Sequence, residues 1–229
     1  MCRRWRTIVL GSPRRLNLQL FCIPGRSAKK ALDVWPSFPL LILNGVSERS
    51  VENVIPVLGV EHRRRIRQIN LQIKPNFNTR YDVELVETLW RAMEVPFPEL
   101  EGLYLGGRLY MPGLSDSFLG GSAPRLRHFQ VYLRGILRFP GLPKLLLSAT
   151  HLVDLHLHDI CDPTYILPYA MANCLAVLTS LETLHIEFDY DNWRPFFFSF
   201  PGTTTLTGLT SASSLHPSRS HLFLVQRGK

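Results

Sequence analysis

HLVDLHLHD, residues 151–159, places leucine at positions 152, 155 and 157 and polar residues at positions 154, 156 and 158. Its second half alternates apolar and polar residues, which is the period of a β-strand that buries one face. A single strand of this kind cannot cover its own apolar face, so neighbouring strands should repeat the pattern.

The pattern recurs without gaps as RIRQINLQI (65–73), ELEGLYLGG (99–107), RLRHFQVYL (125–133) and SLETLHIEF (180–188). The five copies start 34, 26, 26 and 29 residues apart, and leucine-rich repeats have periods of about 20–29 residues. We therefore predict an α/β leucine-rich-repeat solenoid, with parallel strands on a concave face and helices and irregular returns behind them. The apolar frame residues are Ile66, Ile69, Leu71, Leu100, Leu103, Leu105, Leu126, Phe129, Val131, Leu152, Leu155, Leu157, Leu181, Leu184 and Ile186.

Two shorter apolar runs precede these copies and are candidates for the first strands. They are PRRLNL, with Leu16 and Leu18 in the frame, and FPLLIL, with Leu41 and Leu43 in the frame. Periodicity alone leaves both open, because a short apolar run fits more than one structure. With both included, the array spans residues 13–190.

Three of the segments between the copies predict helices, because they combine helix-start residues with apolar residues at helical spacing. These segments are residues 82–94, capped by Asp82, a helix that starts at Pro168, and Glu48–Leu58. Pro56 weakens the second half of the last one. The returns around residues 120–124 and 140–143 are rich in glycine and proline and should be shorter and less regular.

The chain has 45% hydrophobic residues, so it can bury a sizeable core. Its formal net charge of +8 is localised at Arg3–Arg6, Arg14–Arg15 and Arg63–Arg67, and residues 192–229 contain no Asp or Glu. No long band of basic residues interleaved with aromatics is present, so nucleic acid is a less favoured partner than protein. A basic RNA-binding repeat protein that uses Arg63–Arg67 remains the alternative.

Four widely spaced cysteines form no Cys-x-x-Cys pair, so the sequence predicts neither a zinc site nor a disulfide framework. They are Cys2, Cys22, Cys161 and Cys174. Reduced thiols, the lack of a secretory-type apolar run at residues 1–15 and the lack of an apolar stretch of about 20 residues predict a cytoplasmic or nuclear protein with no membrane partner.

Several stretches resemble the F-box and leucine-rich-repeat proteins that are expanded in mushroom-forming fungi. They are MCRRWR (1–6), GSPRRLNLQLF (11–21), DVWPSFPLLI (33–42), and the copies from FPELEGLYLGG to LPKLLLSATHLVDLHLHDI. The resemblance implies a substrate receptor of a cullin-type ubiquitin ligase. The F-box would bind a Skp-type adaptor, and the repeats would bind the protein that is ubiquitinated.

The chain departs from that family at both ends. Only Cys2–Arg6 match the F-box, so residues 1–12 are assigned to a remnant of its last helix, and residues 13–190 to the repeat array. Residues 191–229 do not continue the repeat and are rich in Ser and Thr, which predicts a disordered tail and an exposed edge on the last strand. A phosphorylatable tail and a truncated fragment without function are the alternatives.

The polar residues between the frame positions should line the concave face and bind a partner there. Tyrosine and histidine at adjacent exposed positions are the kind of residues that anchor protein interfaces. The predicted partner-binding residues are Asn70, Gln72, Tyr104, His128, Gln130, Tyr132, Asp154, His156, His158, His185 and Glu187.

HLVDLHLHDICD, residues 151–162, is dense in potential metal ligands, and alternation places His156 and His158 on one strand face with Asp154 beside them. Two imidazoles and a carboxylate on one strand face could approach an ion. A flat sheet face offers no water-excluding pocket, however, so we predict no metal and no cofactor, and favour a histidine pair whose partner binding varies with pH. The serine-hydrolase elbow, the P-loop, the zinc-protease motif and the dinucleotide fingerprint are all missing, so the sequence predicts no enzyme.

Overall fold

The computed structural model describes residues 18–22, 27–34, 39–46, 48–73, 80–107, 113–133, 139–160, 168–189 and 219–224. Within these ranges the chain is an α/β protein with one sheet, in which the strands lie side by side in the order of the sequence. Seven consecutive strands are parallel, and an eighth joins the edge in the antiparallel direction.

The strands are β1 (Leu18–Phe21), β2 (Leu40–Val46), β3 (Ile66–Ile73), β4 (Gly102–Gly107), β5 (His128–Leu133), β6 (Asp154–Ile160), β7 (Thr183–Asp189) and β8 (Arg219–Leu224). The helices are α2 (Ala28–Val34), α3 (Glu48–Val57), α4 (Arg80–Ala92), α5 (Leu142–Ser148) and α6 (Pro168–Val177). Two short 3-10 helices, η2 (Arg63–Arg65) and η3 (Phe118–Gly121), complete the described elements.

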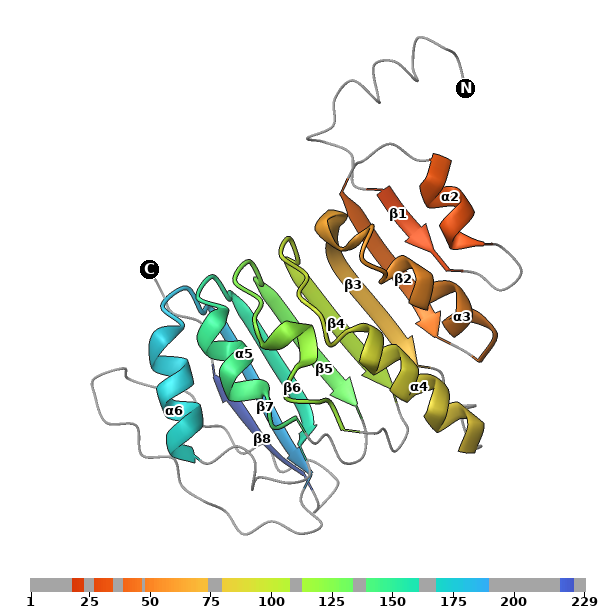
Figure 1. Ribbon diagram of the computed structural model, residues 1–229. Helices are drawn as coiled ribbons and strands as arrows, with labels where there is room; N and C mark the ends of the chain where they lie inside the picture. The colour runs from red at the N-terminus through yellow and green to blue at the C-terminus, as the bar shows by residue number, and fades with distance from the viewer. Residues whose placement is uncertain are drawn as a thin grey trace.

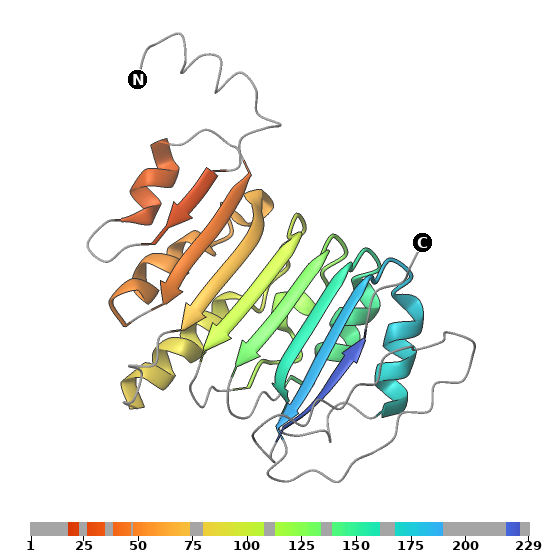
Figure 2. The same ribbon diagram turned by 180° about the vertical axis from the view of Figure 1, so that it is seen from behind.

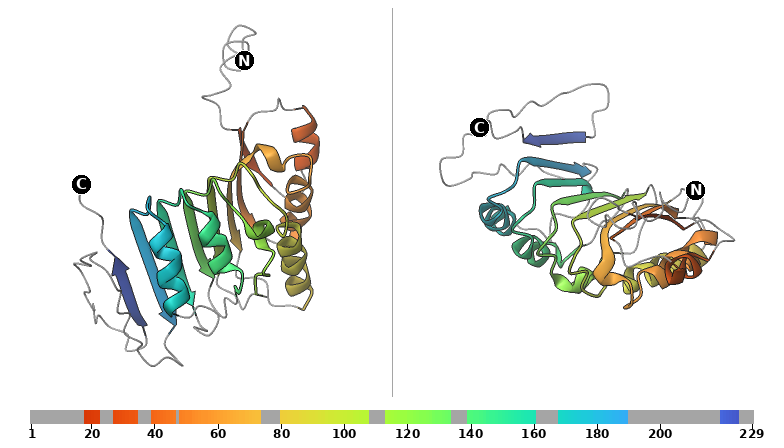
Figure 3. Two further views of the ribbon diagram at one scale, coloured as in Figure 1. Left: turned by 60° about the vertical axis from the view of Figure 1, so that its left-hand side comes forward. Right: turned by 90° about the horizontal axis from the view of Figure 1, so that it is seen from above.

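The α-helices all cover one face of the sheet, and the described residues place no helix on the other face (Figures 1 and 2). The sheet bends so that the helices lie on its outer side (Figure 3). We call the helix-free inner face the concave face. Because side chains alternate along a strand, each strand sends one set of residues toward the helices and the other set to this face.

The apolar frame residues pack between the sheet and its helices. Ile69 and Leu71 of β3 are fully buried, and so are Leu155 and Leu157 of β6. Burying one such side chain contributes about 1.5–3 kcal/mol. The equivalent residues of the other repeats are buried as well, namely Leu103, Leu105, Phe129, Val131, Leu184 and Ile186.

The segments that lead into the strands are stacked by one recurring set of backbone hydrogen bonds. The N–H of Glu101 donates to the C=O of Arg67 over 2.7 Å, and the N–H of Arg127 donates to the C=O of Glu101 over 2.8 Å. Val153 continues the series onto Arg127 over 2.7 Å, and Glu182 onto Val153 over 2.8 Å. This repetition aligns the start of each of the strands β4 to β7 with that of its predecessor.

Aromatic packing fills the core behind β5, where η3 is the helix described in the preceding return. Phe118 and Phe139 meet edge to face with ring centroids 5.4 Å apart, and Phe129 meets Phe139 over 6.5 Å. Edge-to-face contact is a favoured geometry for aromatic pairs. The three rings are buried and form one edge-to-face group in this part of the core.

The returns follow the sequence prediction with two exceptions. α3 and α6 lie where expected, and the return around residues 120–124 is irregular. α4 starts at Arg80, so Asp82 lies within its first turn and the prediction that Asp82 caps the helix was wrong. The prediction of a less regular return at residues 140–143 was wrong, because α5 starts there at Leu142. Pro143 lies in its first turn, where a missing backbone N–H removes no helical hydrogen bond.

The two apolar runs that the sequence left open do contribute strands β1 and β2, but the frame predicted in the FPLLIL run was wrong in phase. Leu41 and Leu43 were expected to face the helices, but Ile42 is fully buried and lies opposite Ile69 of β3. Leu20 of β1 lies opposite Ile42 on the other side, so the frame predicted in the PRRLNL run was placed too early. LLIL contains no polar residue to distinguish its two faces.

At the other end, β8 differs from the expected irregular tail. Its six residues pair with β7 in the antiparallel direction, with Leu222 opposite Ile186, so the edge of β7 is paired rather than exposed. The HLFL sequence within β8 is a short apolar run that the surrounding Ser-rich composition obscured. Residues 1–12 and the remainder of residues 191–229 lie outside the described ranges.

Candidate functional site

The predicted partner-binding residues form rows across the concave face. In the central row, Asn70 lies opposite Tyr104 and Tyr104 opposite Gln130. Gln130 in turn lies opposite His156, and His156 opposite His185. All five side chains are partly exposed. The neighbour relations that the gap-free alignment predicts for this row are confirmed.

A second row runs closer to the start of the strands. Gln68, Gly102, His128, Asp154 and Thr183 lie opposite one another in that order. His128 Nδ1 lies 2.6 Å from Asp154 Oδ2, and both side chains remain partly exposed. This contact becomes an ion pair when the imidazole is protonated.

The third row is regular only as far as β6. Gln72 lies opposite Gly106, Gly106 opposite Tyr132, and Tyr132 opposite His158. The pairing of β6 with β7 then shifts between Leu157 and Ile160, so the expected partnership of His158 with Glu187 is wrong. A gap-free alignment has no way to place such an irregularity. Glu187 lies in β7, and its side chain is outside the described set.

Two glycines of β4 shape the middle of the face, and sequence reasoning had not assigned them a role. A Cβ atom at Gly106 would overlap Oε1 of Gln72, and one at Gly102 would lie 3.2 Å from Cε2 of Tyr104. The amide of Gln72 therefore occupies the space of a side chain at Gly106, and the Tyr104 ring lies close beside Gly102. The sequence signal that could have identified the two glycines is their position in the rows of polar residues.

The three histidines His156, His158 and His185 form one group of rings, which we call the histidine cluster. The ring centroids of His158 and His185 lie 4.4 Å apart, those of His156 and His185 5.8 Å, and those of His156 and His158 6.3 Å. Tyr132 adjoins the cluster, with its ring centroid 4.6 Å from that of His158. Strand alternation predicted a shared face, and the structure brings these rings close together.

The surroundings of His156 disfavour its charged form. Burial lowers the pKa of His156, the nearby His158 lowers it further, and the carboxylate of Asp154 acts in the opposite direction. Burial also raises the pKa of Tyr104, and Asp154 adds to this rise. Near neutral pH the His156 imidazole and the Tyr104 phenol are therefore uncharged.

Metal and thiol chemistry have little support among the described side chains. They contain no group of three His, Cys, Asp or Glu residues that could hold a metal ion. Cys22 and Cys174 are free and buried. Burial raises the pKa of the Cys22 thiol to about 12 and also raises that of Cys174, so both thiols stay protonated near neutral pH.

The basic run around residue 63 lies between α3 and β3, as predicted. Arg63 Nε donates to the C=O of Leu58 over 2.9 Å, and the guanidinium carbon of Arg63 lies 5.9 Å from the centroid of the Phe97 ring. Burial lowers the pKa of both Arg63 and Arg65. Within η2, Arg64 is the exposed residue. Arg63 thus serves packing within the fold.

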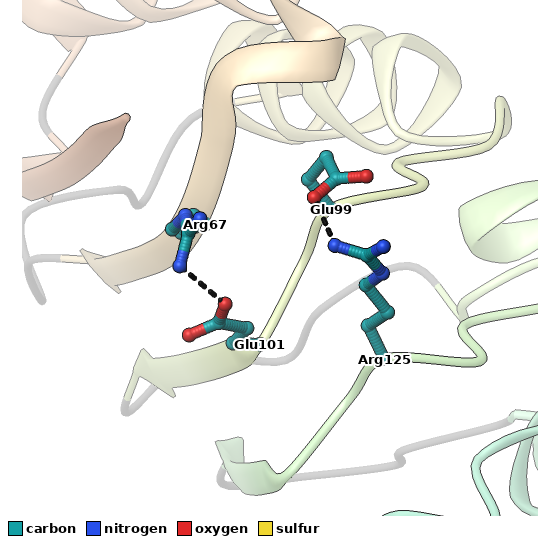
Figure 4. A network of polar contacts seen from close by, with 4 residues as sticks. All are labelled: Arg67, Glu99, Glu101 and Arg125. Atoms are coloured by element: carbon teal, nitrogen blue, oxygen red, sulfur yellow. Dashed lines mark hydrogen bonds and ion pairs between the residues drawn. The ribbon is translucent and has the colours of Figure 1, made fainter. Parts of the chain in front are cut away.

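Two further arginines contact acidic side chains in the segment that leads into β4 (Figure 4). Arg67 contacts Glu101 with 2.7 Å between Nη1 and Oε1, and Arg125 contacts Glu99. Both pairs are partly exposed, so each adds little to stability. They do, however, neutralise positive charge that would otherwise attract a polyanion.

Comparisons with known proteins add no family assignment. The described helices include none that is long and apolar enough to cross a membrane. A scan against models of protein families finds no match, and searches of curated proteins and of solved structures find none either. The geometry of the concave face is therefore the main basis for a functional proposal.

Proposed function

We propose that this chain is a leucine-rich-repeat protein that binds a protein partner on the concave face of its sheet. One observation supports this most strongly. Residues that alternate with the buried frame form three rows of polar side chains and glycines, in register from β3 to β6 and, for two rows, on to β7. A helix-free face with such rows is what a stacked repeat offers to a partner.

The sheet topology supports the solenoid part of this proposal. Each copy of the sequence pattern supplies one parallel strand, and the spatial order of the strands is their sequence order. The backbone bonds that link Arg67, Glu101, Arg127 and Val153 recur at each step. A solenoid grows in this way, because every unit packs on its immediate neighbours.

The chemistry of the rows favours a protein over a nucleic acid. None of the three rows contains Lys or Arg, whereas phosphate binding depends on such cations. Tyr104 and Tyr132 supply aromatic surface that loses little conformational entropy when a partner covers it. The mechanism in this proposal is the presentation of a surface, with no bond made or broken by this chain.

We further propose, on the sequence resemblance to fungal F-box proteins alone, that this surface belongs to a ubiquitin ligase. In that setting the concave face selects the protein to be ubiquitinated, and a Skp-type adaptor and a cullin are separate subunits of the ligase. The ligase chemistry resides in those subunits. The stretch that resembles an F-box, residues 1–12, lies outside the described ranges, so sequence resemblance alone supports the adaptor contact.

An affinity pull-down of the full chain from a nuclease-treated fungal lysate tests both parts. Tyr132→Asp introduces a charge on the concave face, and Tyr169→Asp is its matched control on α6, where the side chain is 77% exposed. We expect wild type and Tyr169→Asp to capture the same proteins and Tyr132→Asp to lose them. Unchanged capture by Tyr132→Asp would contradict the concave-face proposal. Recovery of a Skp-type adaptor and cullin with all three chains would support the ligase setting.

A further inference from the structure

The histidine cluster concentrates three titratable rings on one part of the concave face. Each ring belongs to β6 or β7, and the centroid separations of 4.4 to 6.3 Å mean that protonation of one ring opposes protonation of the next. All three side chains are partly exposed, although Nε2 of His185 is buried, so solvent and a docked partner can reach the exposed parts of the rings.

Among the described side chains, Asp154 is the acid that acts on the cluster, and it opposes the lowering of the His156 pKa. Tyr132 of the adjacent strand β5 adjoins the cluster. Glu187 follows His185 by two residues in β7, and its side chain lies outside the described set. The carboxylate of Asp154 lies 2.6 Å from His128 Nδ1 and so already has a cationic partner when the imidazoles are charged. At the far edge, the backbone pairing of β7 with β8 sets Glu187 opposite His221.

We propose that the histidine cluster is a proton-coupled docking site for an acidic segment of a protein partner. The inference rests on the proposed function and names the chemistry that the face recognises. Carboxylates placed over the cluster would stabilise the charged imidazoles, and the charged imidazoles would hold the carboxylates by charge-assisted hydrogen bonds. The neutral cluster lacks that attraction.

The direction of the coupling follows from the free protein. Burial and His158 lower the pKa of His156, and a docked carboxylate raises an imidazole pKa. The complex therefore takes up protons that the free chain does not hold, and its affinity rises as the pH falls. Glutamate side chains of the partner stay charged at pH 5.5, since their usual pKa is about 4.3.

Fluorescence anisotropy of a labelled dodecapeptide of alternating Glu and Gly measures this coupling on the full chain. Binding is compared at pH 7.5 and pH 5.5 at one ionic strength, and a peptide with Gln in place of Glu is the neutral probe. We expect the Glu peptide to bind at least about fivefold more tightly at pH 5.5, within the usual range of coupling between sites. The Gln peptide should show no such gain.

Variants then locate the effect. The double variant His156→Gln/His185→Gln should lose the pH dependence, while His151→Gln, which removes an exposed histidine in the turn before β6, should retain it. His158→Gln is the second test, and thermal melting of each variant shows whether it is folded. A full pH effect in the folded cluster variants, an equal gain for the Gln peptide, or no binding of the Glu peptide at either pH would overturn the proposal.

The outcomes also separate this inference from the proposed function. If Tyr132→Asp abolishes partner capture while peptide binding shows no pH dependence, the protein-binding face stands and the proton coupling falls. If capture is unaffected by Tyr132→Asp while the Glu peptide still binds in a proton-coupled way, the broader proposal fails and the docking chemistry of the cluster stands.

Discussion

Two adjacent residues of β6 give a direct test of how the strands are oriented. Leu155 is fully buried between the sheet and the helices, whereas the neighbouring His156 belongs to the concave face. Truncating a buried leucine to alanine costs about 2–5 kcal/mol, because it removes buried surface and leaves a cavity. His156→Ala removes a partly exposed ring and should cost less than about 1 kcal/mol.

Urea unfolding monitored by circular dichroism measures this difference. With a denaturant slope of about 2 kcal/mol per molar urea, Leu155→Ala should lower the unfolding midpoint by about 1–2.5 M and His156→Ala by less than about 0.5 M. Both variants should retain the wild-type slope. If the two substitutions cost the same, or His156→Ala costs more, the assignment of the two sheet faces is refuted.

Three further predictions concern stability away from the proposed site. Gly120 has φ +68°, and a Cβ atom there would lie 2.7 Å from the Pro96 ring. Gly120→Ala should therefore lower the free energy of unfolding, measured by thermal or urea unfolding, by at least about 1–2 kcal/mol. A neutral effect would contradict the backbone conformation. Burial and then the charge of Arg65 lower the pKa of the buried His62, so the folded chain binds fewer protons there than the unfolded chain, and this part of the stability is lost as the pH falls below about 6.5. Melting curves at pH 7.5 and pH 5 should therefore show a smaller acid-induced loss for His62→Gln, and an identical loss would count against the buried imidazole. Arg67→Ala removes the exposed pair with Glu101 and should cost less than about 1 kcal/mol, with the difference from wild type vanishing in 1 M salt; a larger, salt-independent loss would show that the contact acts by packing.

The central strands could be predicted from the sequence because each copy has polar residues at fixed positions between its apolar ones. Asn70, Tyr104, Gln130 and His156 mark the solvent side of their strands, and this sets the phase of burial and the register together. The central row of the candidate site follows from the same alignment. Alternation alone was enough to place these residues side by side.

The remaining features depend on three-dimensional contacts that the pattern does not encode. LLIL in β2 is apolar at every position, so either face could be buried. The shift between Leu157 and Ile160 changes the pairing of β6 with β7 without changing the spacing of the frame residues. The pairing of β8 with β7 depends on contacts between residues far apart in the sequence, and the position of Gln72 over Gly106 depends on a side-chain conformation.

The central claim is that a protein partner docks on the concave face, and site-specific photo-crosslinking tests it most directly. A benzophenone amino acid replaces Tyr132, which is 39% exposed on that face, or Tyr169 on α6, and each full-length chain is irradiated in fungal lysate. We predict a discrete crosslinked protein from position 132 that is missing from position 169. Crosslinks from position 169 alone, or the same products from both positions, would contradict the account.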